Sequence, residues 1–61
     1  MEPLHILIID DEPVVCDGCR LVLMDHGHSV DSYTAGTEGM EAFYATPYDL
    51  VLLDLKMPDA E

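Results

Sequence analysis

The sequence predicts an α/β fold built on a doubly wound parallel sheet, and three observations lead to this prediction. Two short apolar runs each stop at aspartate, and such runs are typical of strands covered on both faces, hence of parallel sheets. Two segments whose apolar residues recur at helical spacing alternate with the strands. A strand–helix–strand–helix–strand order demands parallel strands joined by right-handed crossovers.

The first half of the chain is expected to form a strand, a helix and a second strand. Residues 4–9 are almost entirely apolar and stop at an acid pair. Pro13 suits the first turn of a helix over residues 13–26, and Gly27 is a good stop for it. Residues 29–34 alternate enough for a short second strand. The face of the helix expected to be buried consists of Val15, Cys19, Val22, Leu23 and His26.

The second half is expected to add one helix and one strand. A turn at residues 35–37 leads into a short helix over residues 37–45. Residues 49–54 follow as the third strand, which is apolar until Asp54. One face of this short helix is marked by Met40, Phe43 and Tyr44.

The composition favours a folded protein with an acidic surface or site. Thirteen Asp and Glu residues stand against two Lys and Arg, giving a formal charge of −11, yet 49% of the residues are hydrophobic. A disordered acidic tail would contain few apolar residues. Binding to nucleic acid or to an anionic membrane needs clustered Lys and Arg, so we expect neither partner. The apolar runs are too short for a membrane span, and the first residues lack the basic flank and long apolar stretch typical of a signal peptide, so the cytosol is the expected compartment.

The first and third strands each end in acid. Asp10 and Asp11 follow the first strand, and Asp54 ends the third. Carboxyl ends of parallel strands share one edge, where open α/β sheets bind ligands, and neighbouring strands lie about 4.8 Å apart. Three carboxylates this close repel one another unless a cation compensates, and oxygen ligands favour Mg²⁺, with Mn²⁺ as a substitute. A Mg²⁺ beside a nucleophilic carboxylate is an arrangement for forming an aspartyl-phosphate.

At these residues the chain resembles the receiver domain of two-component response regulators. His5–Pro13 resembles the first strand and acid pair of that family, and Tyr48–Asp59 resembles its phosphoacceptor strand and following loop. The resemblance covers the whole chain. An acid pair alone would be a weak signal, but its combination with Asp-x-x-Met-Pro at this separation is specific. It outweighs the plainer interpretation of these acids as a helix cap and a solvated strand end.

The resemblance implies a flavodoxin-like sheet with strand order 2-1-3 and a phosphoacceptor rather than an enzyme. It implies that Asp54 accepts a phosphoryl group from a sensor histidine kinase or a histidine phosphotransfer protein. It also implies that Mg²⁺ is held by Asp11, Asp54 and the backbone carbonyl of Lys56, with Asp10 acting largely through water.

A second apolar stripe lies on the first predicted helix. Val14, Gly18 and Leu21 stand at positions i, i+4 and i+7, away from the face expected to be buried. Such a stripe is unusual on an exposed helix. The family implies that the start of this helix docks the helical bundle that carries the phosphohistidine. We therefore expect these residues to form part of that contact, with incidental surface hydrophobes as the alternative.

The family pattern continues for two more strand–helix units, which carry a Ser or Thr and a Lys that contact the phosphoryl group. The chain is therefore expected to be a receiver truncated after its third strand, with residues 50–53 as an exposed apolar edge. Such an edge recruits another chain, so we expect a homodimer through it. A receiver-fold interaction fragment that is not phosphorylated is the second function considered. A carboxylate-rich Mg²⁺ hydrolase ranks below both.

The cysteines and histidines admit other interpretations. Cys16 and Cys19 could form a redox pair, or half a zinc site with His26 and His28, but their context and spacing argue against both. We expect the two cysteines to behave as small apolar packing residues. His26 is expected to be half-buried in the core, whereas His5 and His28 are expected to face solvent.

Overall fold

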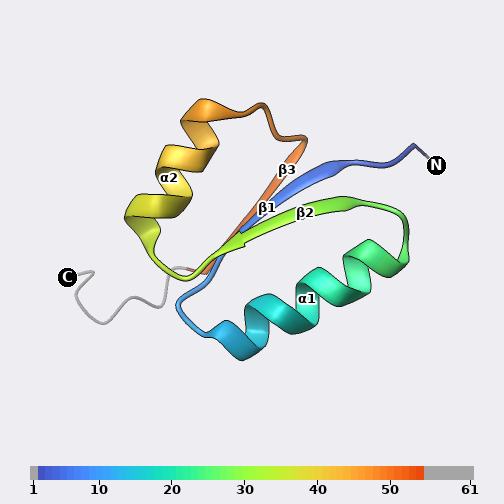
Figure 1. The fold of residues 1–61 in the computed structure, drawn as a ribbon, viewed down its shortest axis with the longest axis horizontal. Coiled ribbons are helices and arrows are strands. Elements are labelled where there is room, and N and C mark those ends of the chain that lie inside the picture. The colour runs from blue at the N-terminus through green and yellow to red at the C-terminus, as the bar shows by residue number, and fades with distance from the viewer. Residues whose placement is uncertain (1, 55–61) are drawn as a thin grey trace.

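The computed structural model describes residues 2–54, which form a parallel sheet lying between two helices (Figure 1). The strand order is β2-β1-β3, which confirms the predicted α/β fold class. No helix in this part of the chain has the length and apolarity needed to cross a membrane. The element bounds, each within one residue of expectation, are β1 His5–Ile9, α1 Pro13–Asp25, β2 Ser29–Tyr33, α2 Gly36–Ala45 and β3 Leu50–Leu53.

β1 is the buried centre of the sheet. Its four residues from Ile6 to Ile9 are all buried. Alternate residues of a strand face opposite sides of a sheet. Ile6 and Ile8 pack with Cys16 of α1, whereas Ile9 lies against Gly39 of α2. The two helices therefore cover opposite faces of the sheet (Figure 1).

The stripe that α1 buries differs from the predicted one. Cys16 is the buried residue of this helix, and the half-buried Leu23 packs beside it against the core. The predicted core residues that are exposed instead are Val15, Cys19, Val22 and His26. The reason is the position of the helix: α1 lies over β2 and β1, so its sheet-facing side is the one that carries Cys16. Most of the predicted stripe lines an open groove between α1 and β3.

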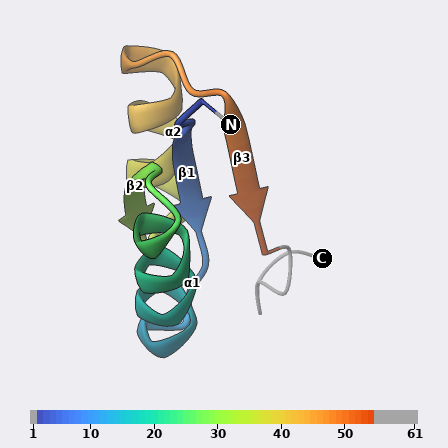
Figure 2. The ribbon, with the colours of Figure 1, turned by 90° about the vertical axis from the view of Figure 1, so that its right-hand side faces the viewer.

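β3 forms one edge of the sheet. Within residues 2–54 it pairs with β1 alone, and neither helix packs against it (Figure 2). Leu50, Leu52 and Leu53 are 42%, 38% and 50% exposed, whereas Val51 is half-buried. The exposed apolar edge expected at residues 50–53 is therefore confirmed, whereas the burial on both faces that an apolar run suggests is not found in this segment. Both helices lie over β1 and β2, which leaves β3 as an exposed apolar strand.

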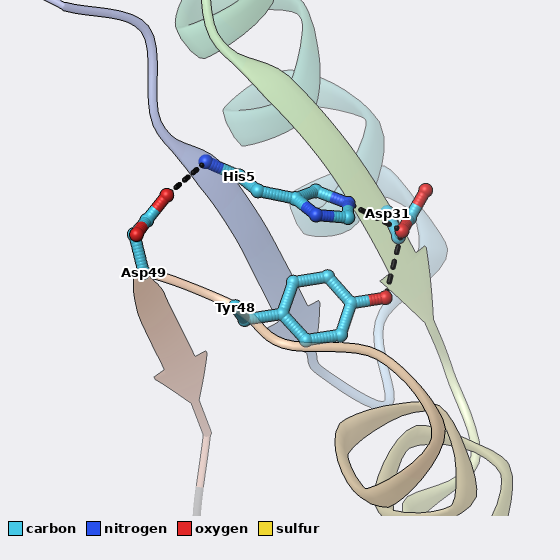
Figure 3. Close-up of polar contacts among 4 residues, drawn as sticks. All are labelled: His5, Asp31, Tyr48 and Asp49. Atoms are coloured by element: carbon cyan, nitrogen blue, oxygen red, sulfur yellow. Dashed lines mark hydrogen bonds and ion pairs between the residues drawn. The ribbon is translucent and has the colours of Figure 1, made fainter.

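A polar cluster joins the three strands at the amino-terminal ends of β1 and β3 (Figure 3). The Tyr48 hydroxyl donates to Oδ2 of Asp31 at 2.7 Å, and Nε2 of His5 lies 3.1 Å from the same oxygen. The Asp49 carboxylate accepts the backbone N–H of His5 at 2.9 Å. The hydrogen bond from Tyr48 lowers the pKa of Asp31, and the same bond raises the pKa of Tyr48 to about 12. These contacts fix the start of β3 against β1 and β2.

The predictions for the histidines are wrong. His5 and His28 are half-buried, and Nδ1 of His28 accepts the backbone N–H of Leu4 at 3.0 Å. His26 is exposed, and its Nδ1 lies 2.9 Å from the carbonyl oxygen of Val22 one turn earlier. Because a carbonyl only accepts, Nδ1 of His26 carries the proton in that contact.

Candidate functional site

Three carboxylates meet at the carboxyl edge of the sheet. One oxygen from each of Asp10, Asp11 and Asp54 lies within 4.8 Å of the others. The pairing of β1 with β3 explains this, because Ile9 stands opposite Leu53. The backbone N–H of Asp54 also donates to the carbonyl of Ile9 at 2.9 Å, so the ladder continues and brings Asp54 level with Asp10. The structure thus brings together the three acids that the sequence placed in one pocket.

Asp10 is the buried member of this acid cluster. Its side chain is 8% exposed, and Oδ1 accepts the backbone N–H of Glu12 at 2.9 Å. This local hydrogen bond is typical of an aspartate that shapes the turn following it. Asp11 is exposed and Asp54 partly exposed. The cluster therefore has a fixed, buried side and a side open to solvent.

Cys16 contacts the backbone behind the acid cluster. Its Sγ donates to the carbonyl oxygen of Asp10 at 3.2 Å and lies 3.7 Å from that of Tyr33. Burial raises the pKa of the Cys16 thiol, and the Asp10 carboxylate raises it further, so the thiol keeps the proton that it donates. Sequence reasoning missed this contact. The available signal was the place of Cys16 in the first turn of a helix that begins directly after the acid pair.

The chemistry of the acid cluster suits a hard divalent cation. Carboxylates at this spacing repel one another, and a cation between them removes the repulsion. The set contains oxygen donors without thiolate or imidazole, which favours Mg²⁺ over zinc. The residues present therefore fit a Mg²⁺ ion.

The remaining predicted site residues lie elsewhere. Val14 and Leu21 of α1 are 83% and 62% exposed, and the space around Gly18 is open. Their proposed docking role stays a prediction. Lys56, whose backbone carbonyl was expected to bind the cation, lies outside the described residues.

The two cysteines differ from each other. Both are free thiols, but Cys16 is buried and Cys19 is exposed, so the packing role predicted for both fits the first alone. Within residues 2–54, the acid cluster is the one group of three or more His, Cys, Asp and Glu side chains close enough to share a cation. The zinc arrangement with His26 and His28 therefore does not form there.

The chain is similar to one protein family and to several transcriptional regulatory proteins. The model of the response regulator receiver domain family matches residues 6–61. The transcriptional regulatory protein QseB of Escherichia coli is 46% identical over 55 residues, which cover 90% of this chain and 25% of that protein. YkoG of Bacillus subtilis, an uncharacterized transcriptional regulatory protein, is 43% identical over 58 residues, covering 95% and 25%. DltR of Streptococcus agalactiae, also a transcriptional regulatory protein, is 36% identical over 55 residues, covering 90% and 25%. The chain spans about a quarter of the length of these relatives.

Proposed function

The chain belongs to the response regulator receiver family, and from this premise we propose that it is the phosphoacceptor segment of a two-component signalling protein. Asp54 accepts a phosphoryl group from a phosphohistidine, and the acid cluster would hold the Mg²⁺ that this chemistry uses. The observation that carries this proposal is the meeting of Asp10, Asp11 and Asp54 within 4.8 Å at the carboxyl edge of the sheet.

The environments of the three acids support different roles for them. Asp54 is partly exposed at the end of β3, where a phosphoryl donor can reach its carboxylate. An oxygen of Asp54 attacks the phosphorus, the bond from phosphorus to the histidine nitrogen breaks, and its electron pair stays on the nitrogen. Bound Mg²⁺ would supply positive charge to the carboxylates and the phosphoryl oxygens. Asp11 is exposed enough to be a direct cation ligand, whereas the buried Asp10 acts largely through water and holds the turn.

The product of this reaction stays on the protein. An aspartyl-phosphate at Asp54 consumes one phosphoryl donor for each chain, so the module acts as a regulatory acceptor and not as an enzyme that turns over. This agrees with the regulatory nature of the family. We place this function in the cytoplasm and assign no membrane or nucleic-acid contact to the segment, whose net charge is −11.

We propose a sensor histidine kinase or a histidine phosphotransfer protein as the partner. Val14, Gly18 and Leu21 would supply part of its docking surface on α1. The exposure of Val14 and Leu21 supports this role, because both side chains are available to a partner. Val14 is the second residue of α1 and follows the acid pair closely, so a partner bound there lies beside the acid cluster.

A second candidate function is a receiver-fold interaction module that forms a homodimer and is not phosphorylated. The exposed leucines of β3 favour it, since an apolar edge strand can pair with another chain. The charge of −11 on each chain opposes such pairing, so the dimer should tighten as salt screens that charge. Sedimentation equilibrium at low and moderate salt measures this, and a folded monomer at both would remove the candidate.

Acetyl phosphate with Mg²⁺ tests the phosphoacceptor proposal. Intact-mass analysis should show one added phosphoryl group on the complete receiver and none on its Asp54→Ala variant. Asp25→Ala is the matched control, because Asp25 is an exposed acid at the last residue of α1, at the other end of that helix from the acid cluster. This variant should still be phosphorylated. The same adduct on Asp54→Ala would exclude Asp54 as the acceptor.

A further inference from the structure

The acid cluster depends on how the chain turns between β1 and α1. Asp10 and Asp11 are adjacent, so a single peptide group joins them. That group is planar and rigid, and its carbonyl belongs to Asp10 while its N–H belongs to Asp11. Whatever fixes the direction of the Asp10 carbonyl therefore also fixes the plane from which the Asp11 side chain departs.

The thiol of Cys16 is a donor to this carbonyl. Sγ lies 3.2 Å from the carbonyl oxygen of Asp10, and the Cys16 side chain is 3% exposed. A buried carbonyl needs a hydrogen-bond partner, because leaving it without one is unfavourable. The thiol provides that partner from the first turn of α1.

Two further hydrogen bonds close a ring around the turn. Oδ1 of Asp10 accepts the N–H of Glu12 at 2.9 Å, and the carbonyl of Glu12 accepts the N–H of Cys16 at 3.1 Å. Together with the thiol contact, these bonds fix both the side chain and the backbone of Asp10 relative to the start of α1. A fourth hydrogen bond comes from the neighbouring strand, where the N–H of Asp10 donates to the carbonyl of Tyr33 at 3.0 Å.

We propose that Cys16 is a positioning residue for the acid cluster, whose thiol holds the peptide between Asp10 and Asp11 in the orientation that directs both carboxylates toward Asp54. This inference deepens the proposed function and rests on it, since the gathered carboxylates matter when they bind a cation. The role differs from ordinary packing. An alanine or valine would occupy the core at this position, but neither would donate a hydrogen bond to the carbonyl.

The role predicts how substitutions of Cys16 change cation affinity. Residues that orient cation ligands typically change metal affinity by 10–100-fold when they are replaced, and because a thiol is a weak donor we expect about 10-fold weaker binding of Mn²⁺ for Cys16→Ala. Cys16→Ser keeps a donor and should retain an affinity within about threefold of the unmodified chain. The control is Cys19→Ala, which removes the exposed thiol of the same helix and should leave the affinity unchanged.

The experiment has two parts, both on the full chain. A titration measures the affinity for Mn²⁺, and the ¹³C resonance of the Asp10 carbonyl is recorded separately, without the metal. We expect Cys16→Ala to weaken Mn²⁺ binding and to shift this resonance toward the position of a carbonyl with a weaker hydrogen bond, while Cys16→Ser keeps both. Should Cys16→Ala fail to fold, Cys16→Val takes its place as the variant without a donor. A residue that only packs would alter the melting temperature but not the affinity of the folded protein or the resonance.

Three results overturn the inference while leaving the proposed function in place. The first is an unchanged Mn²⁺ affinity in folded Cys16→Ala. The second is an Asp10 carbonyl resonance that does not shift in Cys16→Ala. The third is a loss of Mn²⁺ affinity in Cys16→Ser as large as the loss in Cys16→Ala. If the unmodified chain itself bound no Mn²⁺, the proposed function would fail instead. The Asp10 resonance would then still decide whether Cys16 holds the peptide.

Discussion

Replacing Gly39 by alanine tests how α2 packs against the strand that carries the acid pair. A Cβ at Gly39 would lie 2.5 Å from Cγ1 and 2.6 Å from Cδ1 of Ile9. Side-chain carbons do not approach so closely, so either Ile9 or the helix must move. Because Cγ1 and the nearby Cγ2 of Ile9 are held close to the backbone of the central strand, the clash cannot be relieved by moving only the end of the side chain.

The magnitude follows from comparison with a second glycine. Overpacking a filled core costs about 1–3 kcal/mol, whereas alanine in a helix is about 1 kcal/mol more favourable than glycine. At Gly18, also within a helix, a Cβ would meet nothing within 4 Å. Gly18→Ala should therefore stabilise the protein by up to about 1 kcal/mol. The gain from replacing glycine by alanine in a helix is common to both variants. Gly39→Ala should therefore be less stable than Gly18→Ala by the cost of overpacking, about 1–3 kcal/mol.

Urea unfolding followed by circular dichroism measures this difference. The midpoint should fall for Gly39→Ala relative to Gly18→Ala while the slope stays the same. Adding Ile9→Val, which removes Cδ1, should cost less in the Gly39→Ala background than alone, because the two positions are in contact. Equal stability of the two glycine variants would show that α2 does not approach Ile9 as closely as the structure has it.

Three further predictions concern the polar cluster and the acid cluster. Tyr48→Phe should lower the free energy of unfolding by about 1 kcal/mol, because its hydrogen bond to the partly exposed Asp31 carboxylate is lost. Tyr44 is exposed, so the control Tyr44→Phe should leave the free energy of unfolding almost unchanged. Equal effects of the two substitutions would refute this prediction. The stability of the fold should also depend on pH in two ranges. The raised pKa of Tyr48 gives stability that is present below pH 10.0 and is lost as the pH rises toward about 12. The lowered pKa of Asp31 gives stability that is present above pH 3.8 and is lost on further acidification. Tyr48→Phe should lack the alkaline loss, and a loss of the same size in that variant would count against the assignment. Mg²⁺ at 100 times its dissociation constant should stabilise the folded chain by about 2.7 kcal/mol, visible as a higher melting temperature that Asp54→Ala does not show, and an unmoved melting temperature in a folded sample would mean that the acid cluster binds no Mg²⁺.

The fold and the acid cluster were predictable because their signals are local. Apolar runs that stop at Asp10 and Asp54 identify both the strands and their carboxyl ends. A parallel sheet then places those ends at one edge without any knowledge of side-chain packing. The pairing of Ile9 with Leu53 follows the same logic, since two strands that end in acid align at their ends.

The buried face of α1 was not predictable in the same way. Both the stripe with Val15, Cys19 and Val22 and the stripe with Cys16 and Leu23 have helical spacing. The choice between them depends on whether the helix lies over β2 or β3, which is a property of the assembled sheet. Periodicity along one helix holds no information on that position.

The polar cluster was missed because its members are far apart in the sequence. His5 and Asp31 are 26 residues apart, and Asp31 and Tyr48 are 17 apart. Their meeting requires the register of β1 with β2, in which Leu7 stands opposite Asp31 and His5 lies two residues earlier on the same face. The alternation of polar and apolar residues in β2 predicted a strand, but it did not predict the hydrogen-bond partners of its polar residues.

Locating the phosphoryl group tests the central claim most directly. After incubation with acetyl phosphate and Mg²⁺, borohydride reduces an aspartyl-phosphate to homoserine, and peptide mass mapping then identifies the modified residue. The account predicts homoserine at position 54 alone, in amounts that fall when Mg²⁺ is chelated. Homoserine at Asp10 or Asp11, or an equal yield at position 54 without Mg²⁺, would contradict it.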